Sequence, residues 1–297
     1  MTRRIVYLVL VALAALAVAG CGGSKKSSSS TSTTPTSSSS SGKLAAEVPA
    51  KFKGKTLTVA ADATYAPNEF IAPDGHTVEG MDADLAQAIA SQLGLKAQVK
   101  NATFDSIIPG LAAGKYDLGM SSFTDTKERE KTVDFVTYFS AGTSFFVKTP
   151  GGPTVNSLAD LCGKIVTVEK GTTQQDDSTA QGKKCTAAGK PGVKVLTFPD
   201  QNGANLALAS GRAQVGMADS PIVDYQVKQS NGQFKLTGKP YGTAPYGIAI
   251  PKGTGLAKPI LDAVKALMAD GTYDKIMKKW GIQTGEIHNP QINGAIS

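Results

Sequence analysis

The chain has 297 residues and a formal net charge of +7, with 41% hydrophobic and 19% charged residues. Its lysines are scattered and no aromatic residues are interleaved with them, which disfavours nucleic acid as a partner. The two histidines, His76 and His288, are far apart and no C-x-x-C sequence is present, so we expect neither a metal site nor another cofactor.

Residues 1–20 have the layout of a secretory signal peptide. Two arginines precede an apolar run over residues 5–18, and small residues then lead to Cys21. The sequence VAGC at this point resembles the lipobox of bacterial lipoproteins, in which the peptide is cut before the cysteine and the cysteine is lipidated. A transmembrane anchor is the weaker alternative, because the apolar run is short for about 30 Å of hydrocarbon. We therefore expect Cys21 to carry a lipid that holds the chain at the outer face of the cell membrane.

Residues 21–43 are expected to form a disordered tether. From Ser24 to Gly42 the segment is almost entirely serine and threonine, so it has too little apolar surface to bury. A flexible tether of about 20 residues has a root-mean-square reach of roughly 25 Å. The folded part is therefore expected to begin near Leu44, and its roughly 250 residues suit two lobes better than a single core.

Predicted strands and helices alternate along the folded part. MDADLAQAIASQLG, at 81–94, places apolar residues four apart on one face of a helix that ends at Gly94. A second amphipathic helix is predicted at 103–114, and short runs rich in apolar and β-branched residues predict strands at 97–100, 164–169 and 193–198. This alternation is typical of α/β units.

Two pairs of segments match each other without a gap. LAAGKYDLGMSS at 111–122 aligns with LASGRAQVGMAD at 208–219, and GKTLTVAADAT at 54–64 aligns with GKIVTVEKGTT at 163–173. The first pair predicts a helix end, a turn with glycine and a short strand, and the second predicts a strand that enters a loop. Chance similarity between glycine- and alanine-rich stretches is the alternative, but both pairs occur in the same order. We therefore predict two α/β lobes, related by duplication or by shared architecture.

Polar residues follow the predicted strands of both lobes. They are Asp62, Thr64, Tyr65, Ser121 and Ser122 in one lobe, and Glu169, Thr172, Thr173 and Asp219 in the other. Ligands of open α/β sheets bind beyond the carboxyl ends of the strands, and clefts between domains are preferred sites for small molecules. We therefore expect these residues to face one another across a cleft between the lobes.

The segment SSFTDTKERE, at 121–130, combines four hydroxyl side chains with Arg129. A nucleophile is disfavoured, because no G-x-S-x-G surrounds Ser121 or Ser122 and neither histidine lies in a matching context. A guanidinium fork matches a carboxylate bidentately, and donors at a strand-to-helix turn favour an anion. An anion site is therefore one interpretation, and capping or surface roles for Thr126 and its neighbours are the other.

Two cysteines, Cys162 and Cys185, remain once Cys21 is assigned to the lipid. An even number of cysteines in an oxidising compartment predicts a disulfide. A metal site is the weaker alternative, because the histidines are isolated in the sequence. We expect Cys162 and Cys185 to be bonded to each other.

A series of motifs runs over about residues 55–283: AADATYAPNEF, GMDADLAQAIASQLG, FDSIIPGLAAGKYDLGMSSFTDTKERE, VDFVTYF, KGTTQ and YDKIMKKWGI. In this order they resemble solute-binding protein family 3, the polar amino acid-binding proteins of bacterial ABC importers. The resemblance implies two Rossmann-like α/β lobes joined by a two-segment hinge, the type II periplasmic-binding-protein architecture. It places the crossings at 140–146 and 241–247, lobe one at 44–143 with 243–297, and lobe two at 144–242.

The resemblance also implies roles for individual residues. For the α-carboxylate of a bound amino acid these are Ser122, Thr124 and Arg129, with Thr173 closing from lobe two. For the α-ammonium the residue is Asp219, and for the ligand side chain they are Tyr65, Phe104 and Asp62. Ser121 and Thr172 join them as donors at strand ends, and Phe104 has plain helix core as its alternative role.

Asn68 and Glu169 depart from the family pattern. Asn68 stands where an aromatic residue is usual, so the shape of the side-chain pocket is left open. Glu169 stands where many relatives carry an uncharged residue. Two alternatives remain for it, a place across from Asp62 and a solvated surface position.

The implied function is binding without chemistry. An amino acid is captured between the lobes and delivered to a membrane permease, and the driving ATPase is a separate protein because this chain has no Walker motif. The protein is expected to be a monomer. Two alternatives are a dehydratase-like enzyme that uses Asp62, Glu169 and Asp219, and a passive surface lipoprotein.

Charge predicts the class of ligand. Arg129 and Asp219 cancel the carboxylate and ammonium of an amino acid, which leaves Asp62 beside the ligand side chain. Glutamate and aspartate would be repelled, and an apolar side chain would leave a buried carboxylate unpaired. We therefore expect a polar neutral or basic amino acid: glutamine, arginine, lysine or histidine. The alternative is that Asp62 turns to donors in its own loop.

Overall fold

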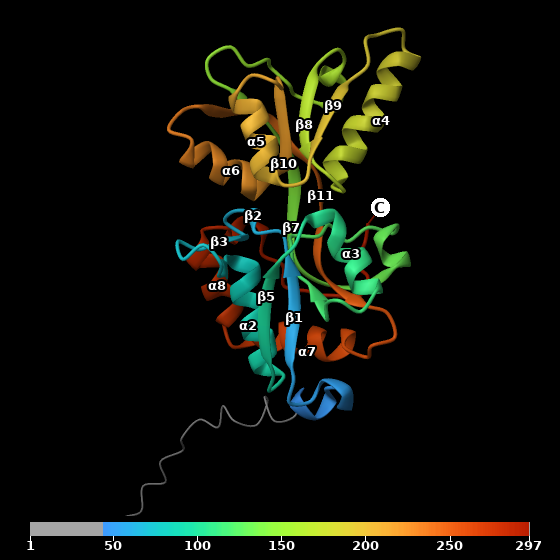
Figure 1. Ribbon diagram of the computed structural model, residues 1–297, viewed down its shortest axis with the longest axis vertical. Coiled ribbons are helices and arrows are strands. Elements are labelled where there is room, and N and C mark those ends of the chain that lie inside the picture. The colour runs from blue at the N-terminus through green and yellow to red at the C-terminus, as the bar shows by residue number, and fades with distance from the viewer. Residues whose placement is uncertain (1–43, 297) are drawn as a thin grey trace, which may run out of the picture. The chain divides into compact units, whose positions relative to one another are not determined.

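A computed structural model describes residues 44–296 (Figure 1). The predicted signal peptide, the lipid site at Cys21 and the tether up to residue 43 lie outside the described residues. In the part of the chain that the structure describes, none of the helices has the length and apolar character needed to cross a membrane.

The core of the fold is an eight-stranded sheet with the order β5-β1-β6-β11-β7-β10-β8-β9. Its strands are β1 (Thr56–Ala61), β5 (Lys96–Asn101), β6 (Leu118–Gly119), β7 (Val133–Lys148), β8 (Ile165–Glu169), β9 (Lys194–Phe198), β10 (Val215–Asp219) and β11 (Phe234–Pro251). A separate small sheet contains β2 (Thr64–Tyr65), β3 (Glu69–Ile71) and β4 (Val78–Glu79). In the large sheet, β1 is parallel to β5 and β6, and β8 is parallel to β9 and β10.

Helices cover this sheet in the alternating order that the sequence predicts. Residues 44–47 are helical, and the α-helices that follow are α2 (Met81–Gln92), α3 (Phe104–Ala112), α4 (Thr173–Ala187), α5 (Gln201–Ala209), α6 (Ser220–Gln229), α7 (Ala257–Ala269) and α8 (Thr272–Trp280). The 3-10 helices are η1 (Ala50–Phe52), η2 (Arg129–Lys131), η3 (Leu158–Leu161) and η4 (Gln283–Gly285). Helix α2 buries its predicted apolar face, and Gly94 follows it with the left-handed φ of +66° that suits a glycine after a helix.

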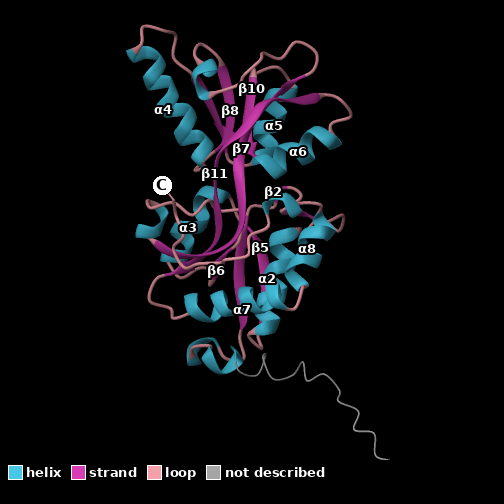
Figure 2. Cartoon of the chain, turned by 180° about the vertical axis from the view of Figure 1, so that it is seen from behind, coloured by secondary structure: helices cyan, strands magenta, loops and turns pink. Residues whose placement is uncertain are grey.

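Two long antiparallel strands, β7 and β11, connect two groups of elements. Their pairing runs from Phe234 opposite Lys148 to Pro251 opposite Val133. Both views show β1, β5, α2, α3, α7 and α8 around one end of this pair, and β8, β10 and α4–α6 around the other (Figures 1 and 2). We call the first group, with β2–β4 and β6, lobe one, and the second group, with β9, lobe two. The prediction of two α/β lobes joined by two crossing segments is thereby confirmed.

The predicted crossings, 140–146 and 241–247, both lie inside these two strands. The pairing of β11 with β7 shifts register between Thr237 and Tyr241, between Tyr241 and Ala244, and again between Tyr246 and Gly247. The irregular stretch thus falls where the chain passes from one lobe to the other. The residue bounds proposed for the lobes stay a prediction.

The matching segments of the sequence occupy equivalent places in the two lobes. The segment at 111–122 runs from the end of α3 into β6, and the segment at 208–219 runs from the end of α5 into β10. The other pair contains β1 and β8, which are each parallel to two neighbours in the sheet. The repeat therefore predicted the layout of both lobes correctly.

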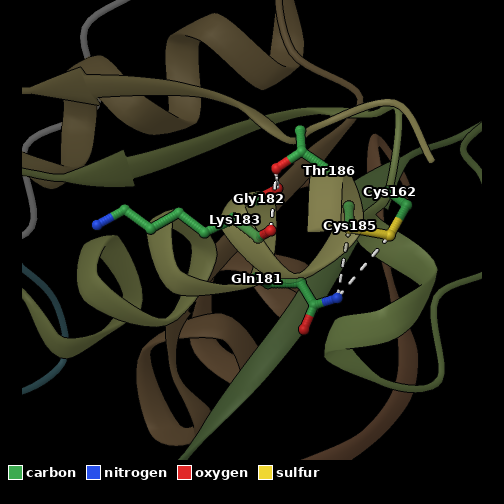
Figure 3. Close-up of a disulfide and its surroundings, with 6 residues drawn as sticks. All are labelled: Cys162, Gln181, Gly182, Lys183, Cys185 and Thr186. Carbon is green, nitrogen blue, oxygen red and sulfur yellow. Dashed lines mark hydrogen bonds between the residues drawn. A yellow bond between two sulfur atoms is a disulfide. The ribbon is translucent and has the colours of Figure 1, made fainter. Parts of the chain in front are cut away.

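The predicted disulfide is present in lobe two. Cys162 follows η3 and Cys185 lies in α4, with Cα atoms 5.6 Å apart (Figure 3). The amide of Gln181, one turn before Cys185 on α4, points at both sulfur atoms, at 3.4 Å from the Sγ of Cys185 and 3.8 Å from that of Cys162. The bond joins two elements of one lobe and does not cross the β7–β11 connection.

Candidate functional site

One cavity lies where the strand ends of the two lobes meet. The space between its lining residues is about 280 Å³, including solvent at its opening. Its lining residues are Asp62, Tyr65, Phe104, Ser121, Ser122, Thr124, Arg129, Glu169, Thr172, Thr173, Gln174 and Asp219. Every residue predicted to contact a ligand is in this set, so the structure brings all of them together. Gln174 is the member that the sequence analysis missed.

The sheet explains why these residues converge. Asp62 follows β1, and Ser121 and Ser122 follow β6, which is parallel to β1. Glu169 ends β8, and Asp219 ends the parallel strand β10. Because the carboxyl ends of parallel strands meet at one edge of a sheet, each lobe presents its polar residues together.

Arg129 reaches the cavity from η2 and connects the two lobes. Its Nη1 donates to the carbonyl of Thr124 at 2.8 Å, and its Nη2 donates to the carbonyl of Gly171 in lobe two at 3.0 Å. Its guanidinium carbon lies 5.3 Å from the ring centre of Phe104 and 5.5 Å from that of Phe123, both within cation–π range. Burial lowers the pKa of Arg129 to about 10, so the group keeps its charge at neutral pH. Two of its five N–H donors are used in these bonds.

The loop that carries this cluster differs from the prediction in one respect. Within the described residues, the segment between β6 and β7 contains the 3-10 helix η2 and no α-helix, so the predicted strand-to-helix turn is wrong. The reason is that Thr124 pairs with Tyr246 of β11 as an isolated bridge and keeps the chain extended. Thr126 makes a local bond just before this helix, since its Oγ1 accepts from the backbone N–H of Arg129 at 3.2 Å.

Asp219 is held in place by three neighbours. Its Oδ1 accepts from Nε2 of Gln174 at 2.7 Å, and its Oδ2 accepts from the hydroxyl of Tyr246 at 2.7 Å. Its backbone N–H donates to the hydroxyl of Tyr65 at 3.1 Å, which joins lobe two to lobe one. Burial raises the pKa of Asp219, while these hydrogen bonds and the charge of Arg129 oppose the rise. A fixed carboxylate next to a cavity suits an ammonium group.

The hydroxyls of Ser121 and Ser122 point to a second layer of acids behind the cavity. Ser121 donates to Glu69 Oε1 at 3.0 Å, and Ser122 donates to Glu69 Oε2 at 3.2 Å. The backbone N–H of Ser122 donates to Asp82 Oδ2 at 2.8 Å, and Ser122 has the uncommon left-handed φ of +51°. These bonds hold Ser121 and Ser122, which we call the serine turn, in place. Glu69 and Asp82 were not predicted as site residues, although they lie in the motifs AADATYAPNEF and GMDADLAQAIASQLG.

Asn68 belongs to the same layer and does not line the cavity. It is fully buried, and its Nδ2 donates to Ser122 Oγ at 2.8 Å. Asn68 therefore affects the side-chain pocket only indirectly. Asn68 supports the serine turn, and it leaves the pocket walls to other residues.

Asp62 and Glu169 approach each other from opposite lobes. Asp62 Oδ1 accepts from Thr64 Oγ1 at 2.6 Å, and Asp62 Oδ2 accepts from the backbone N–H of Phe104 at 3.0 Å. Asp62 and Glu169 line the same cavity, and each carboxyl affects the pKa of the other. Glu169 is only 2% exposed, so of its two alternatives the solvated surface position is wrong. Asp62 uses a donor in its own loop and lines the cavity as well.

The pKa values of both carboxyls respond to this arrangement. Burial raises the pKa of Asp62, and its bonds to Thr64 and Phe104 counteract the rise. Burial raises the pKa of Glu169 well above its usual range, and the neighbouring charges of Asp62 and Asp219 add to the effect. In the conformation described here, the pair therefore favours carrying a proton.

The remaining lining residues come from helix starts and aromatic side chains. Thr172 caps α4, since its Oγ1 accepts from the N–H of Gln175, and Thr173 begins that helix. The first N–H groups of a helix lack partners within it and favour an anion. Phe104 is stacked on Phe123, with ring centres 4.5 Å apart, and also belongs to a core cluster of lobe one. Both of its predicted roles, wall and core, are thus compatible with its position.

Metal binding finds no support in this region. Across residues 44–296, the structure has no group of three or more histidine, cysteine, aspartate or glutamate side chains placed to hold an ion. The charged residues that line the cavity are Asp62, Arg129, Glu169 and Asp219.

Sequence comparisons identify the relatives of this chain. Residues 57–283 match the model of the bacterial extracellular solute-binding proteins, family 3. An arginine-binding protein of Corynebacterium glutamicum is 32% identical over 80% of this chain and 78% of its own length. A glutamine-binding protein of an ABC transporter from Bacillus subtilis is 37% identical over 70% of this chain and 74% of its own.

Solved structures give the same result. An ancestral arginine-binding protein bound to arginine superposes with a TM-score of 0.70 at 40% identity, over 76% of this chain and 97% of its own. An ancestral arginine-binding protein bound to glutamine superposes with a TM-score of 0.69 at 41% identity, over 76% of this chain and 98% of its own. An ancestral amino acid-binding protein described as a precursor of cyclohexadienyl dehydratase superposes with a TM-score of 0.65 at 35% identity, over 76% of this chain and 95% of its own.

Proposed function

The chain belongs to the bacterial extracellular solute-binding proteins of family 3, and on that premise we propose that it captures an amino acid between its lobes for delivery to an ABC importer. The observation that carries this proposal is the pair of fixed opposite charges in one cavity. Arg129 offers a guanidinium fork, and Asp219 offers a carboxylate held by Gln174 and Tyr246. Every α-amino acid carries the complementary two charges.

The lobes supply the closing movement. Several contacts cross between them, including the bond from Arg129 to Gly171 and the ion pair of Lys170 with Asp105, whose charged atoms are 2.8 Å apart. Gly171 packs so closely on Asp105 that a Cβ atom at Gly171 would lie 3.0 Å from the Cβ of Asp105. We infer that the lobes separate to admit a ligand and close over it by hinge motion at the irregular stretches of β7 and β11.

A polar neutral or basic amino acid fits the cavity best. Asp62 and Glu169 are two acids beyond the pair that matches the ligand's own charges. They repel the side chains of glutamate and aspartate, and an apolar side chain would leave them without a partner. Relatives of this chain are named for binding arginine and for binding glutamine, which supports the same class. The class includes glutamine, arginine, lysine and histidine.

Binding without chemistry is the better of two proposals for this cavity. The relationship to a precursor of a dehydratase keeps an enzyme as the second candidate, with Asp62, Glu169 and Asp219 as its acids. The named relatives of this chain include transporter binding proteins, and Asp219 is committed to hydrogen bonds that fix a carboxylate. Incubation with a prephenate-like acid should yield no product, and turnover would favour the enzyme.

The partners follow from this function. The protein would act as a monomer that docks on a membrane permease, with the ATPase on a separate chain. A lipid on Cys21 would hold it at the outer face of the membrane. Cys21→Ala should release the protein from the membrane fraction, and the intact mass of the membrane-extracted protein should show the lipid. An unmodified Cys21 in that extract would rule out the anchor.

A calorimetric screen tests the binding function. Each of the twenty common amino acids would be titrated into the full-length protein at neutral pH. We expect saturable binding of at least one polar neutral or basic amino acid. If none of the twenty binds, the function proposed here is wrong.

A further inference from the structure

The acid pair of Asp62 and Glu169 has a feature that amino acid binding in general does not require. Glu169 is 2% exposed and lines the cavity, yet its Oε1 has no hydrogen-bond partner within residues 44–296. A buried polar atom without a partner is costly, and native structures contain few of them. This oxygen is therefore an open position for a donor that a ligand or a proton can fill.

The two acids meet only because the lobes are together. Asp62 follows β1 in lobe one, and Glu169 ends β8 in lobe two. When the lobes separate, each carboxyl faces water, where it is ionised at neutral pH. When the lobes close, two carboxylates are brought together out of water. A neighbouring like charge disfavours ionisation, so a cation or a proton that compensates one of the two carboxylates stabilises the closed form.

The charged neighbours that raise these two pKa values are acids. Asp200 raises the pKa of Asp62, which the hydrogen bonds from Thr64 and Phe104 lower, and Asp62, Asp219 and Asp200 raise the pKa of Glu169. The cation of the cavity, Arg129, acts on Asp219. If the ligand carboxylate and ammonium match Arg129 and Asp219, the compensating charge must come from the ligand side chain or from solvent.

We propose that Asp62 and Glu169 form a proton-sharing pair that selects the charge of the ligand side chain. A neutral side chain is bound with uptake of one proton, which comes from solvent, binds a carboxyl oxygen of the pair and is donated to the other carboxylate. A cationic side chain sits at the same place and makes that proton unnecessary. The inference rests on the proposed amino acid binding and assigns Glu169 the role of a residue that determines specificity.

The sign of the pH dependence follows from proton counting. The complex with a neutral ligand holds about one proton more than the separated partners, so its affinity falls as pH rises, by up to about tenfold per unit. The complex with a cationic ligand holds no extra proton, so its affinity stays level. The ratio of arginine to glutamine affinity should therefore increase with pH between pH 5.5 and 7.

Calorimetry measures the proton directly. Glutamine and arginine would each be titrated into the full-length protein in buffers of different ionisation enthalpy, which gives the number of protons taken up. We expect uptake of about 0.5–1 proton with glutamine and close to none with arginine. Equal uptake for both ligands would overturn the proposal.

Variants identify the groups that bind the proton. Glu169→Gln and Asp62→Asn each leave a single carboxyl that needs no shared proton, so each should abolish uptake with glutamine and weaken arginine at least about tenfold. Glu79→Gln, at an exposed position of β4, is the matched control and should behave as wild type. Unchanged uptake in Glu169→Gln would contradict the proposal.

The failure of this inference is distinguishable from the failure of the binding function. If neither ligand binds and no other amino acid does, the function itself is wrong and this inference falls with it. If the protein binds amino acids with a proton count that does not depend on side-chain charge, only the proton-sharing pair is wrong. If only one of the two ligands binds, the effect of Glu169→Gln on the binding of that ligand is the test. If this variant changes neither the affinity nor the proton uptake, Glu169 does not determine specificity.

Discussion

Two buried acid pairs in this protein differ in what surrounds them. Glu69 and Asp82 both belong to lobe one, where they accept from the side chains of Ser121 and Ser122 and from the backbone of Ser122. Asp62 and Glu169 come from different lobes and face a cavity, and Glu169 has an oxygen without a partner within the described chain. Asp82 Oδ1 also has no hydrogen-bond partner within the described chain, but neither Glu69 nor Asp82 lines the cavity, so the first pair suits a structural role. The second is left for a ligand to complete, which suits recognition.

The largest effect is expected at the charges that match the amino acid itself, outside both pairs. Arg129→Ala removes the guanidinium fork, and Asp219→Ala removes the counter-charge of the ammonium. Truncating one partner of a desolvated charge pair costs about 2–5 kcal/mol, so each variant should bind at least about thirtyfold more weakly. Calorimetry on the full-length protein measures this loss. Affinity within threefold of wild type would remove that residue from the site.

Asp82 tests the structural pair. Asp82→Ala leaves the buried N–H of Ser122 without its acceptor, so the free energy of unfolding should fall by about 1–3 kcal/mol. Asp82→Asn is the matched control, because its amide oxygen can still accept that bond and its NH₂ can donate to Glu69. Denaturant unfolding should place Asp82→Asn close to wild type. Equal losses for both variants would show that charge, and not the hydrogen bond, is what matters.

The same pair predicts a pH dependence of stability. Burial, with Asp82 as a further cause, raises the pKa of Glu69 well above its usual range. The folded protein therefore holds a proton that the unfolded chain loses above about pH 4.5. The contribution of this proton to the free energy of unfolding is fully present below about pH 4.5. It is lost as the pH rises toward the pKa that Glu69 has in the folded protein. Asp82→Asn should flatten this slope in unfolding curves measured between pH 4.5 and 8, and an unchanged slope would assign it to other groups.

Asp62 tests the recognition pair. Asp62→Asn removes one carboxylate from the cavity and keeps an oxygen for the N–H of Phe104. A basic ligand should lose at least about 1.4 kcal/mol of binding energy, which is tenfold in affinity, whereas a neutral polar ligand should change much less at neutral pH. Competition between arginine and glutamine measures the difference. A uniform loss for both ligands would place Asp62 in the support of the loop and outside ligand choice.

The smallest effect is expected at the exposed contact between the lobes. Lys170 and Asp105 form an ion pair whose side chains are 59% and 28% exposed. Pairs of this kind contribute about 0–1 kcal/mol, so Lys170→Ala should weaken ligand binding no more than about fivefold. The effect should shrink further at high salt. A loss of affinity as large as that of Arg129→Ala would mean that the ion pair of Lys170 with Asp105, and not the cavity, controls the closure of the lobes.

The sequence predicted the lobes and the lining of the cavity because these depend on local patterns. Apolar periodicity set the faces of helices such as α2, and the internal repeat set the order of strand ends. Polar residues that directly follow strands, such as Asp62 and Asp219, necessarily gather at one edge of each lobe. For these residues, position along the chain determines position in space.

The second layer could not be predicted in the same way. Glu69, Asp82 and Asn68 lie in β3, at the start of α2 and just before β3, and their convergence on Ser122 depends on tertiary packing. Local polarity alone gives such residues the appearance of surface positions. Glu169 presents the same difficulty, since an acid that ends a strand has the appearance of a surface position, yet it is buried.

The most direct test of the account is the order of affinities for four amino acids. Glutamine, arginine, glutamate and leucine would be titrated into the full-length protein at pH 7 under identical conditions. A cavity with two surplus acids predicts that glutamine or arginine binds at least about tenfold more tightly than glutamate and leucine. Tighter binding of glutamate or leucine than of both glutamine and arginine would contradict the account.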